Sequence, residues 1–232
     1  MMTYHPNDPS TWSRTAGQGL TVGLDLGFAS DHSALVIGGV WPQAQSAIGV
    51  FDIQQLPLVT PMNEVADLAA DLARKHSARI IADLSNNSAF AALLAARLGR
   101  NPANYMVGAV IAGADTHANI PTPMPVSLGG VRAAVPRWSL SKPELIETVA
   151  AEMENGSLRI AKVGDWEKLR DELAAMEREA RRSGAVAYSA PAGKHDDLVV
   201  ALGLCVFGCR RFGSVAHVRR PNASRASWAA WT

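Results

Sequence analysis

The sequence predicts an α/β fold, in which a mixed sheet of five strands, or slightly more, is covered by helices on both faces. Three short apolar runs separated by turn residues come first, and the later apolar runs alternate with amphipathic helical patterns. The last run is apolar on nearly every side, which indicates a central helix. With 232 residues, 48% of them hydrophobic, the chain is long enough for one well-buried domain.

The first half of the chain predicts an antiparallel meander followed by a parallel crossover. Thr60 is expected to cap the first helix, with Pro61 at its first position. The fourth strand comes directly after that helix, so it should pair in parallel with the first strand. In order, the expected elements are strands at 20–26, 33–41 and 47–53, a helix from 60, a strand at 78–84, a helix at 87–98 and a strand at 105–111.

The second half predicts three helices and two short extended segments after a long loop. The loop is rich in Gly, Pro and small residues, and a loop of this length in a compact domain is usually functional. Ser141 and Glu144 form a capping box, and Asp165 is expected to cap the next helix. In order, we expect the loop at 113–138, a helix at 141–153, a strand at 158–161, a helix at 165–183, an extended segment at 186–190 and a helix at 195–211.

Residues 19–212 are expected to form this domain, between flexible segments at 1–18 and 213–232. The net charge of +1 excludes a strongly basic body that binds nucleic acid over its whole surface. The long loop and the basic C-terminal end are candidate DNA contacts, although a solvated terminus explains the basic residues equally well. These are Arg210, Arg211, Arg219, Arg220 and Arg225.

Two cysteines and the absence of targeting signals bear on location. Cys205 and Cys209 lie one helical turn apart without a second metal-ligand pair, so we expect them to pack as small apolar residues in a reduced compartment. The sequence contains neither a signal-peptide core nor a long apolar run. A cytoplasmic location without membrane contact is therefore expected.

Three carboxylates lie within or beside apolar runs. Asp25 lies between Leu24 and Leu26 in the first strand, Asp83 ends the fourth strand, and Asp197 opens the last helix. A carboxylate in such a place is costly unless it is paired, hydrogen-bonded or bound to a metal. Together the three acids predict a site for two Mg²⁺ or Mn²⁺ ions about 3.5–4 Å apart, an arrangement that hydrolyses phosphodiesters.

Simpler roles exist for some of these acids. Asp83 could cap the helix that follows it, and Asp196 or Asp197 could be an ordinary N-cap. A capping role does not explain an aspartate inside a core strand, so the predicted metal site depends mainly on Asp25.

Other polar residues near these acids are candidates for binding substrate. Lys194 and His195 could contact phosphate, or they could be solvated loop residues. The segment 30–32 could line the same site, or it could form a simple turn.

The acidic segments resemble the nuclease domain of phage terminase large subunits, which has an RNase H-like fold. The resemblance rests on Gly-Leu-Asp25-Leu-Gly, on Ile-Ala-Asp83 and, most specifically, on Gly-Lys-His-Asp-Asp197-Leu-Val-Val-Ala-Leu. The stretch from Val-Pro-Arg137 to Ser-Lys142 is similar to the family's segment between its second and third acids. In all, the resemblance covers about residues 20–212.

The resemblance implies a metal-dependent endonuclease that cuts concatemeric viral DNA during head packaging. The implied partners are double-stranded DNA and a packaging ATPase, a terminase small subunit or a portal. The resemblance implies that the metals are held by Asp25, Asp83 and one or both of Asp196 and Asp197, of which Asp197 is preferred. Our hypothesis is that Asp25 bridges two ions and that Asp83 and Asp197 each complete one site. The residues expected to contact substrate are Arg137, Lys142, Lys194 and His195.

One feature departs from that family's complete motor. The sequence contains no Gly-x-x-x-x-Gly-Lys-Ser/Thr loop, so ATP-driven translocation is not expected from this chain. Three other functions remain open: a Holliday-junction resolvase-like nuclease, a sugar-kinase or actin-like ATPase, and a non-catalytic module that binds DNA or protein. The ATPase would need a second comparable domain, for which the chain has no room.

Overall fold

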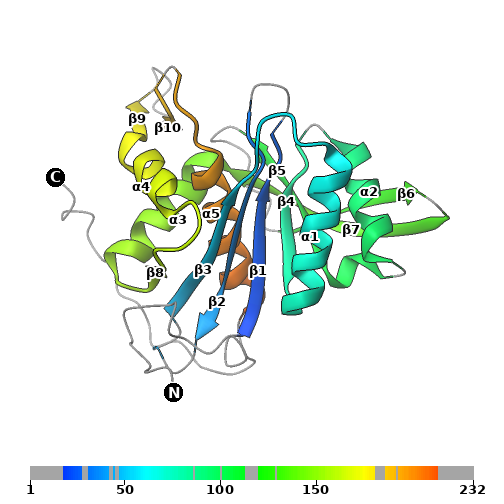
Figure 1. Cartoon of the computed structure of the whole chain (residues 1–232). Helices are drawn as coiled ribbons and strands as arrows, with labels where there is room; N and C mark the ends of the chain where they lie inside the picture. The colour runs from blue at the N-terminus through cyan, green and yellow to red at the C-terminus, as the bar shows by residue number, and fades with distance from the viewer. Residues whose placement is uncertain are drawn as a thin grey trace.

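A computed structural model describes residues 18–27, 31–41, 44, 47–85, 87–99, 101–112, 120–128, 130–180, 186–191 and 193–213. It confirms the predicted α/β fold, with a mixed sheet and helices on both faces (Figure 1). Most of the predicted N-terminal segment, nearly all of the predicted tail, Ser30 and residues 113–119 lie outside the described residues.

The main sheet has eight strands in the order β6-β7-β5-β4-β1-β2-β3-β8. The three first strands form the predicted meander, and β4 pairs in parallel with β1, as the crossover requires. In chain order the elements are β1 (Gln18–Asp25), β2 (Ala34–Trp41), β3 (Ala47–Gln55), α1 (Met62–His76), β4 (Arg79–Asp83), α2 (Ser88–Leu98), a 3₁₀ turn (Pro102–Asn104), β5 (Met106–Ala112), β6 (Thr122–Leu128), β7 (Val131–Ser141), α3 (Lys142–Glu154), β8 (Leu158–Ile160), α4 (Trp166–Ala175), β9 (Glu177–Ala180), β10 (Val186–Ser189) and α5 (Asp197–Phe212).

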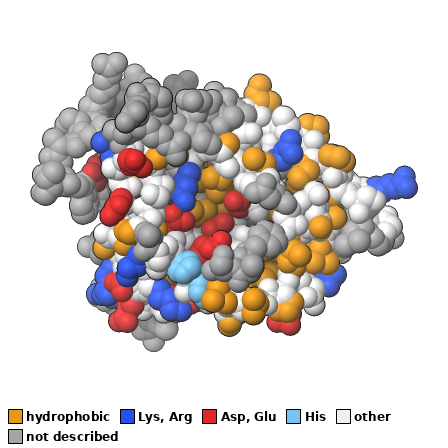
Figure 2. Space-filling view, turned by 90° about the horizontal axis from the view of Figure 1, so that it is seen from above, with side chains coloured by type: hydrophobic (Ala, Val, Ile, Leu, Met, Phe, Trp, Pro, Cys, Tyr) orange, Lys and Arg blue, Asp and Glu red, His pale blue; other side chains and the backbone are white. Residues whose placement is uncertain are grey.

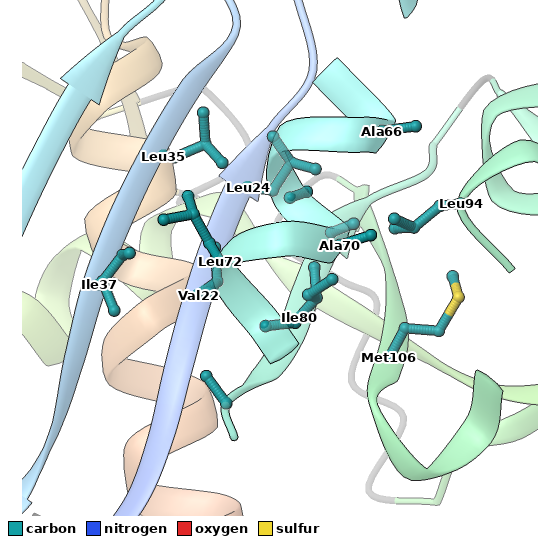
Figure 3. Packing of buried hydrophobic residues seen from close by; sticks show 14 of the residues in the cluster. Val22, Leu24, Leu35, Ile37, Ala66, Ala70, Leu72, Ile80, Leu94 and Met106 are labelled. Atoms are coloured by element: carbon teal, nitrogen blue, oxygen red, sulfur yellow. The ribbon is translucent and has the colours of Figure 1, made fainter. Parts of the chain in front are cut away.

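Helices α1 and α2 cover one face of the sheet. Their small and branched side chains pack against every second residue of the strands, because only alternate strand residues point to a given face of the sheet. Figure 3 shows this layer, with strand residues such as Val22 and Ile80 packed against Ala70 and Leu72 of α1. Leu94 of α2 belongs to the same buried cluster.

Helix α5 covers the other face and is buried along almost its whole length, which confirms the predicted central helix. It lies very close to β1 because a glycine faces it there. A Cβ atom on Gly23 would lie 2.0 Å from the carbonyl oxygen of Ala201 and 2.5 Å from the amide nitrogen of Cys205. Cys205 and Cys209 are free thiols buried in this helix, as expected for small apolar residues.

The segment predicted as a long loop is instead largely a β-hairpin. Strands β6 and β7 occupy residues 122–128 and 131–141 and pair antiparallel. The prolines that suggested a loop, Pro123 and Pro125, lie in β6, which is the edge strand of the sheet. An edge strand tolerates proline because half of its amide positions need no partner. The main sheet therefore has eight strands, where five or slightly more were expected.

The helix predicted over 165–183 is also wrong in its second half. Helix α4 ends at Ala175, and the helix-favouring sequence after it forms β9, which pairs with β10. Tertiary pairing here overrides local propensity. Asp165 does not cap α4 through its side chain, since its Oδ2 accepts the Gln55 amide at 2.8 Å.

The start of α1 differs from the prediction by one residue. Pro61 is the N-cap residue, and no side chain caps this helix. The Thr60 hydroxyl instead donates to the Pro57 carbonyl at 2.6 Å, so it is not available to the helix amides.

No helix within the described ranges is long and apolar enough to cross a membrane.

Candidate metal centre

The acids of β1 and β4 lie side by side at the end of the sheet that the carboxyl ends of these two strands form. Asp25 and Asp83 are the last residues of their strands. The parallel register pairs Leu24 with Ala82, so the two aspartates that follow are neighbours at the carboxyl ends of the strands. This is the juxtaposition that the crossover predicts.

Helix α5 brings the third acid to the same end of the sheet. It begins at this end of the sheet and runs back along β1, with Ala201 against Gly23. Asp197 lies one helical turn before Ala201, about 6 Å along the axis, and Asp25 lies two strand residues after Gly23, about 7 Å. The close approach at Gly23 therefore places Asp197 at the level of Asp25.

These acids share a pocket of about 340 Å³. Viewed from above, the surface shows acidic side chains gathered around a hollow beside a histidine (Figure 2). Most of the predicted site residues line it, as does Asp31 from the segment 30–32. The charged and histidine side chains that line the pocket are Asp25, Asp31, Asp83, Lys142, Lys194, His195, Asp196 and Asp197.

Arg137 is the one predicted substrate contact that the structure places elsewhere. It lies on β7, between Thr122 of the edge strand β6 and Gly108 of β5, four residues before the end of β7, and does not line the pocket. The predicted basic C-terminal end also begins inside the fold. Arg210 pairs with Glu152, its Nε 2.6 Å from Oε1, and Arg211 lies over the Trp138 ring at 4.6 Å from its centroid.

The carboxylates of the pocket disfavour one another's charge. Burial raises the pKa of Asp25 well above its ordinary value, and the charges of Asp83 and Asp197 raise it further. Burial likewise raises the pKa of Asp83, against hydrogen bonds from Ser85 that lower it. Burial raises the pKa of Asp197, opposed mainly by His195. A cation in this pocket would relieve both the repulsion and the burial of charge.

Asp83 is oriented by its own turn rather than by the helix that follows. Its Oδ1 accepts the amide of Ser85 at 2.9 Å and the Ser85 hydroxyl at 2.5 Å. The Ser85 oxygen in turn accepts the Ile111 amide at 2.8 Å, which ties the turn to β5. Asn87 caps α2 by accepting the Phe90 amide at 2.8 Å, so the capping role considered for Asp83 is wrong.

The two adjacent aspartates at the start of α5 have different surroundings. Asp196 Oδ2 lies 2.7 Å from Lys142 Nζ in an ion pair. Asp197 is only 7% exposed, and among the described residues its Oδ2 is buried without a hydrogen-bond partner. The His195 Nδ1 atom lies 3.7 Å from that oxygen.

The donor set suits a hard divalent cation, because its groups are carboxylate oxygens and one of them is buried and unsatisfied. Across the described ranges, no group of three or more His, Cys, Asp or Glu side chains is already arranged to hold an ion. Two of the acids are held instead by protein groups, Asp83 by Ser85 and Asp196 by Lys142.

Glu172 of α4 is a functional candidate that sequence reasoning missed. It is 9% exposed, and burial together with the charges of Asp197 and Asp196 raises its pKa to about 7. Its Oε2 accepts the amides of Leu198 and Val199. A signal was present, because Glu172 lies three residues after Leu169 on the apolar stripe of its helix, where a charge is unexpected.

No protein-family model matches the sequence, and no curated protein matches it either. Solved structures do match. The large terminase nuclease from thermophilic phage G20c has a TM-score of 0.55 at 17% identity, covering 81% of each chain. The nuclease domain of the large terminase subunit gp2 of bacterial virus Sf6 has a TM-score of 0.59 at 15% identity, covering 84% of this chain and 90% of that one.

A domain from human cytomegalovirus matches as well. The human cytomegalovirus terminase nuclease domain has a TM-score of 0.55 at 13% identity, covering 92% of this chain and 94% of that one. This chain has the fold of a large terminase nuclease domain. The RNase H-like prediction is thereby confirmed. Each of these matches covers four fifths of this chain or more.

Proposed function

We propose that this chain is a metal-dependent endonuclease of the large-terminase type, which cuts double-stranded DNA during genome packaging. The observation that carries the proposal is the convergence of Asp25, Asp83 and Asp197 from three separate elements on one pocket, each with a raised pKa. Acids that repel one another when metal-free are a suitable donor set for a divalent cation. Structures of the G20c nuclease hold cobalt or magnesium, and one of the Sf6 domain holds manganese.

The proposed cofactor is a pair of Mg²⁺ or Mn²⁺ ions. Asp25 would bridge them, because it is the acid whose pKa is raised by the charges of both others, and Asp83 and Asp197 would each complete one site. Asp197 is preferred to Asp196 because it has the unsatisfied oxygen, whereas Asp196 is paired with Lys142. When bound, the ions would lower the pKa of a water nucleophile and stabilise the leaving oxygen of the phosphodiester.

The basic groups at the pocket are proposed to bind the DNA backbone. Lys142 and Lys194 line the pocket, and His195 is 42% exposed between Asp31 and Asp197. Arg137 would contact DNA only outside the pocket. The net charge is +1, so affinity from these few groups should be modest and strongly salt-dependent. A packaging ATPase, a terminase small subunit or a portal would then hold the domain on its substrate.

The test is cleavage of supercoiled plasmid by the whole chain with Mn²⁺, Mg²⁺, Ca²⁺ or EDTA. We expect nicked and linear products with Mn²⁺ or Mg²⁺ and none with EDTA. A folded protein that leaves the plasmid intact with every metal would contradict the proposal. A four-way junction run beside linear duplex separates this function from that of a resolvase-like nuclease, which would prefer the junction.

A further inference from the structure

The helix that carries Asp197 is capped by a carboxylate from another helix. Glu172 Oε2 accepts the amide of Leu198 at 2.9 Å and that of Val199 at 3.2 Å. These are the second and third residues of α5, whose amides an N-cap side chain ordinarily satisfies. The N-cap residue Asp196 makes no such bond and is paired with Lys142 instead. The cap is therefore supplied from α4.

Glu172 is itself held in place from two sides. Leu169, one turn earlier on α4, is fully buried in the cluster that includes Leu198 and Val199 of α5. The side-chain amide of Gln55, at the end of β3, donates a hydrogen bond to Glu172 Oε1 at 3.4 Å. The backbone N–H of Gln55 donates to Asp165, at the start of α4. The carboxylate is thus a fixed link between β3, α4 and the first turn of α5.

We propose that Glu172 is a positioning residue, which holds the first turn of α5 so that Asp197 faces the pocket. The inference rests on the proposed function, because Asp197 is taken to be a metal ligand. With the cap supplied by Glu172, Asp196 can pair with Lys142 and Asp197 can keep an oxygen unsatisfied in the pocket. Residues beyond the direct ligands that orient a ligand typically change metal affinity 10- to 100-fold when they are replaced.

Two conservative variants separate position from charge. Glu172→Gln keeps the side-chain length and an acceptor oxygen but removes the charge. The side-chain amide of Gln55 can then rotate so that its oxygen accepts a hydrogen bond from the new side-chain NH₂ group. Glu172→Asp keeps the charge but is one methylene shorter, so it cannot reach both amides unless a helix moves. A positioning role predicts that Gln is tolerated and Asp is not. Glu167→Ala is the matched control, because Glu167 is exposed on the same helix.

Two readouts are needed, both on the whole chain. The first is hydrogen exchange at the Leu198 and Val199 amides in the metal-free protein, which tests the cap without reference to metal. We expect protection in wild type and Glu172→Gln and faster exchange in Glu172→Asp. The second is Mn²⁺ affinity by calorimetric titration. We expect Glu172→Asp to bind Mn²⁺ about tenfold or more weakly, while Glu172→Gln and Glu167→Ala stay within about threefold of wild type.

The outcomes are distinguishable from failure of the proposed function. If wild type binds no Mn²⁺, the proposed function fails, while the exchange data still report on the cap. If wild type binds Mn²⁺ and Glu172→Asp binds it equally well, the positioning role is overturned. The opposite order, with Gln impaired and Asp tolerated, would also overturn it, because charge rather than reach would then be the requirement.

Discussion

Asp25→Asn is expected to abolish DNA cleavage while leaving the fold intact. Asparagine has the shape of aspartate but supplies one neutral oxygen, so it cannot bridge two cations. Metal stabilisation of a reacting phosphodiester contributes several kcal/mol, and each 1.36 kcal/mol is a factor of ten in rate. The plasmid cleavage rate in Mn²⁺ should therefore fall at least about a thousandfold, with an unchanged circular dichroism spectrum.

The same substitution should stabilise the metal-free protein at neutral and alkaline pH. The pKa of Asp25 is raised in the folded state, so the folded protein holds this proton more tightly than the unfolded chain does. The resulting destabilisation is absent below about pH 4, the unfolded pKa, and grows as the pH rises through the folded pKa. At pH 8 in EDTA we expect Asp25→Asn to melt above wild type, with little difference near pH 4.

Metal should reverse this order. At a Mn²⁺ concentration of 100 times Kd, ligand binding stabilises a folded protein by about 2.7 kcal/mol. Wild type should therefore gain thermal stability with Mn²⁺ at pH 8, and Asp25→Asn should gain little. Asp52→Asn serves as the control, since Asp52 lies in β3, away from the pocket, and hydrogen-bonds Gln54. An Asp25→Asn protein that cuts plasmid at the wild-type rate would contradict the assignment of this residue.

Gly23→Ala is expected to be the most destabilising single methyl addition in the molecule's central layer. The new Cβ would lie 2.0 Å from the Ala201 oxygen and 2.5 Å from the Cys205 nitrogen, and both are backbone atoms of α5 that cannot rotate away. Overpacking a core usually costs about 1–3 kcal/mol, and here the helix itself must shift. We expect a loss of about 3 kcal/mol or more and a melting temperature lower by about 6–12 °C.

Gly108→Ala is the matched control for this effect. Gly108 lies in β5, another central strand, but a Cβ there would first meet the Leu84 Cδ1 atom at 3.0 Å, the end of a flexible side chain. Its melting temperature should stay within about 3 °C of wild type. If Gly23→Ala melted within 2 °C of wild type, by the same measure, α5 would not lie against β1 as the structure has it, and the route that brings Asp197 beside Asp25 would be lost.

The parts of the fold and site that could be predicted from sequence are those with a local signal. Strands β1 to β5 are apolar runs between turn residues, and the crossover rule then places Asp25 beside Asp83 without further information. Asp25 was conspicuous because no turn or cap explains a carboxylate between two leucines. The last helix was identifiable because nearly every side of it is apolar.

The parts that could not be predicted depend on contacts between distant segments. Strand β6 contains Pro123 and Pro125, and only its place at the sheet edge makes them tolerable. The sequence around Glu177 favours helix, and pairing with β10 turns it into a strand. The cap of α5 comes from Glu172, 26 residues away from Leu198. Spacing rules for helix caps, which look within four residues, cannot find such a partner.

The most direct test of the central claim is anomalous diffraction from crystals of the chain soaked in Mn²⁺. The account predicts manganese peaks in the pocket, within coordination distance of the carboxylates of Asp25, Asp83 and Asp197, with Lys142 no longer beside Asp196 if that acid also coordinates. Peaks elsewhere, or an empty pocket with the Lys142–Asp196 ion pair intact in a crystal that admits Mn²⁺, would contradict it.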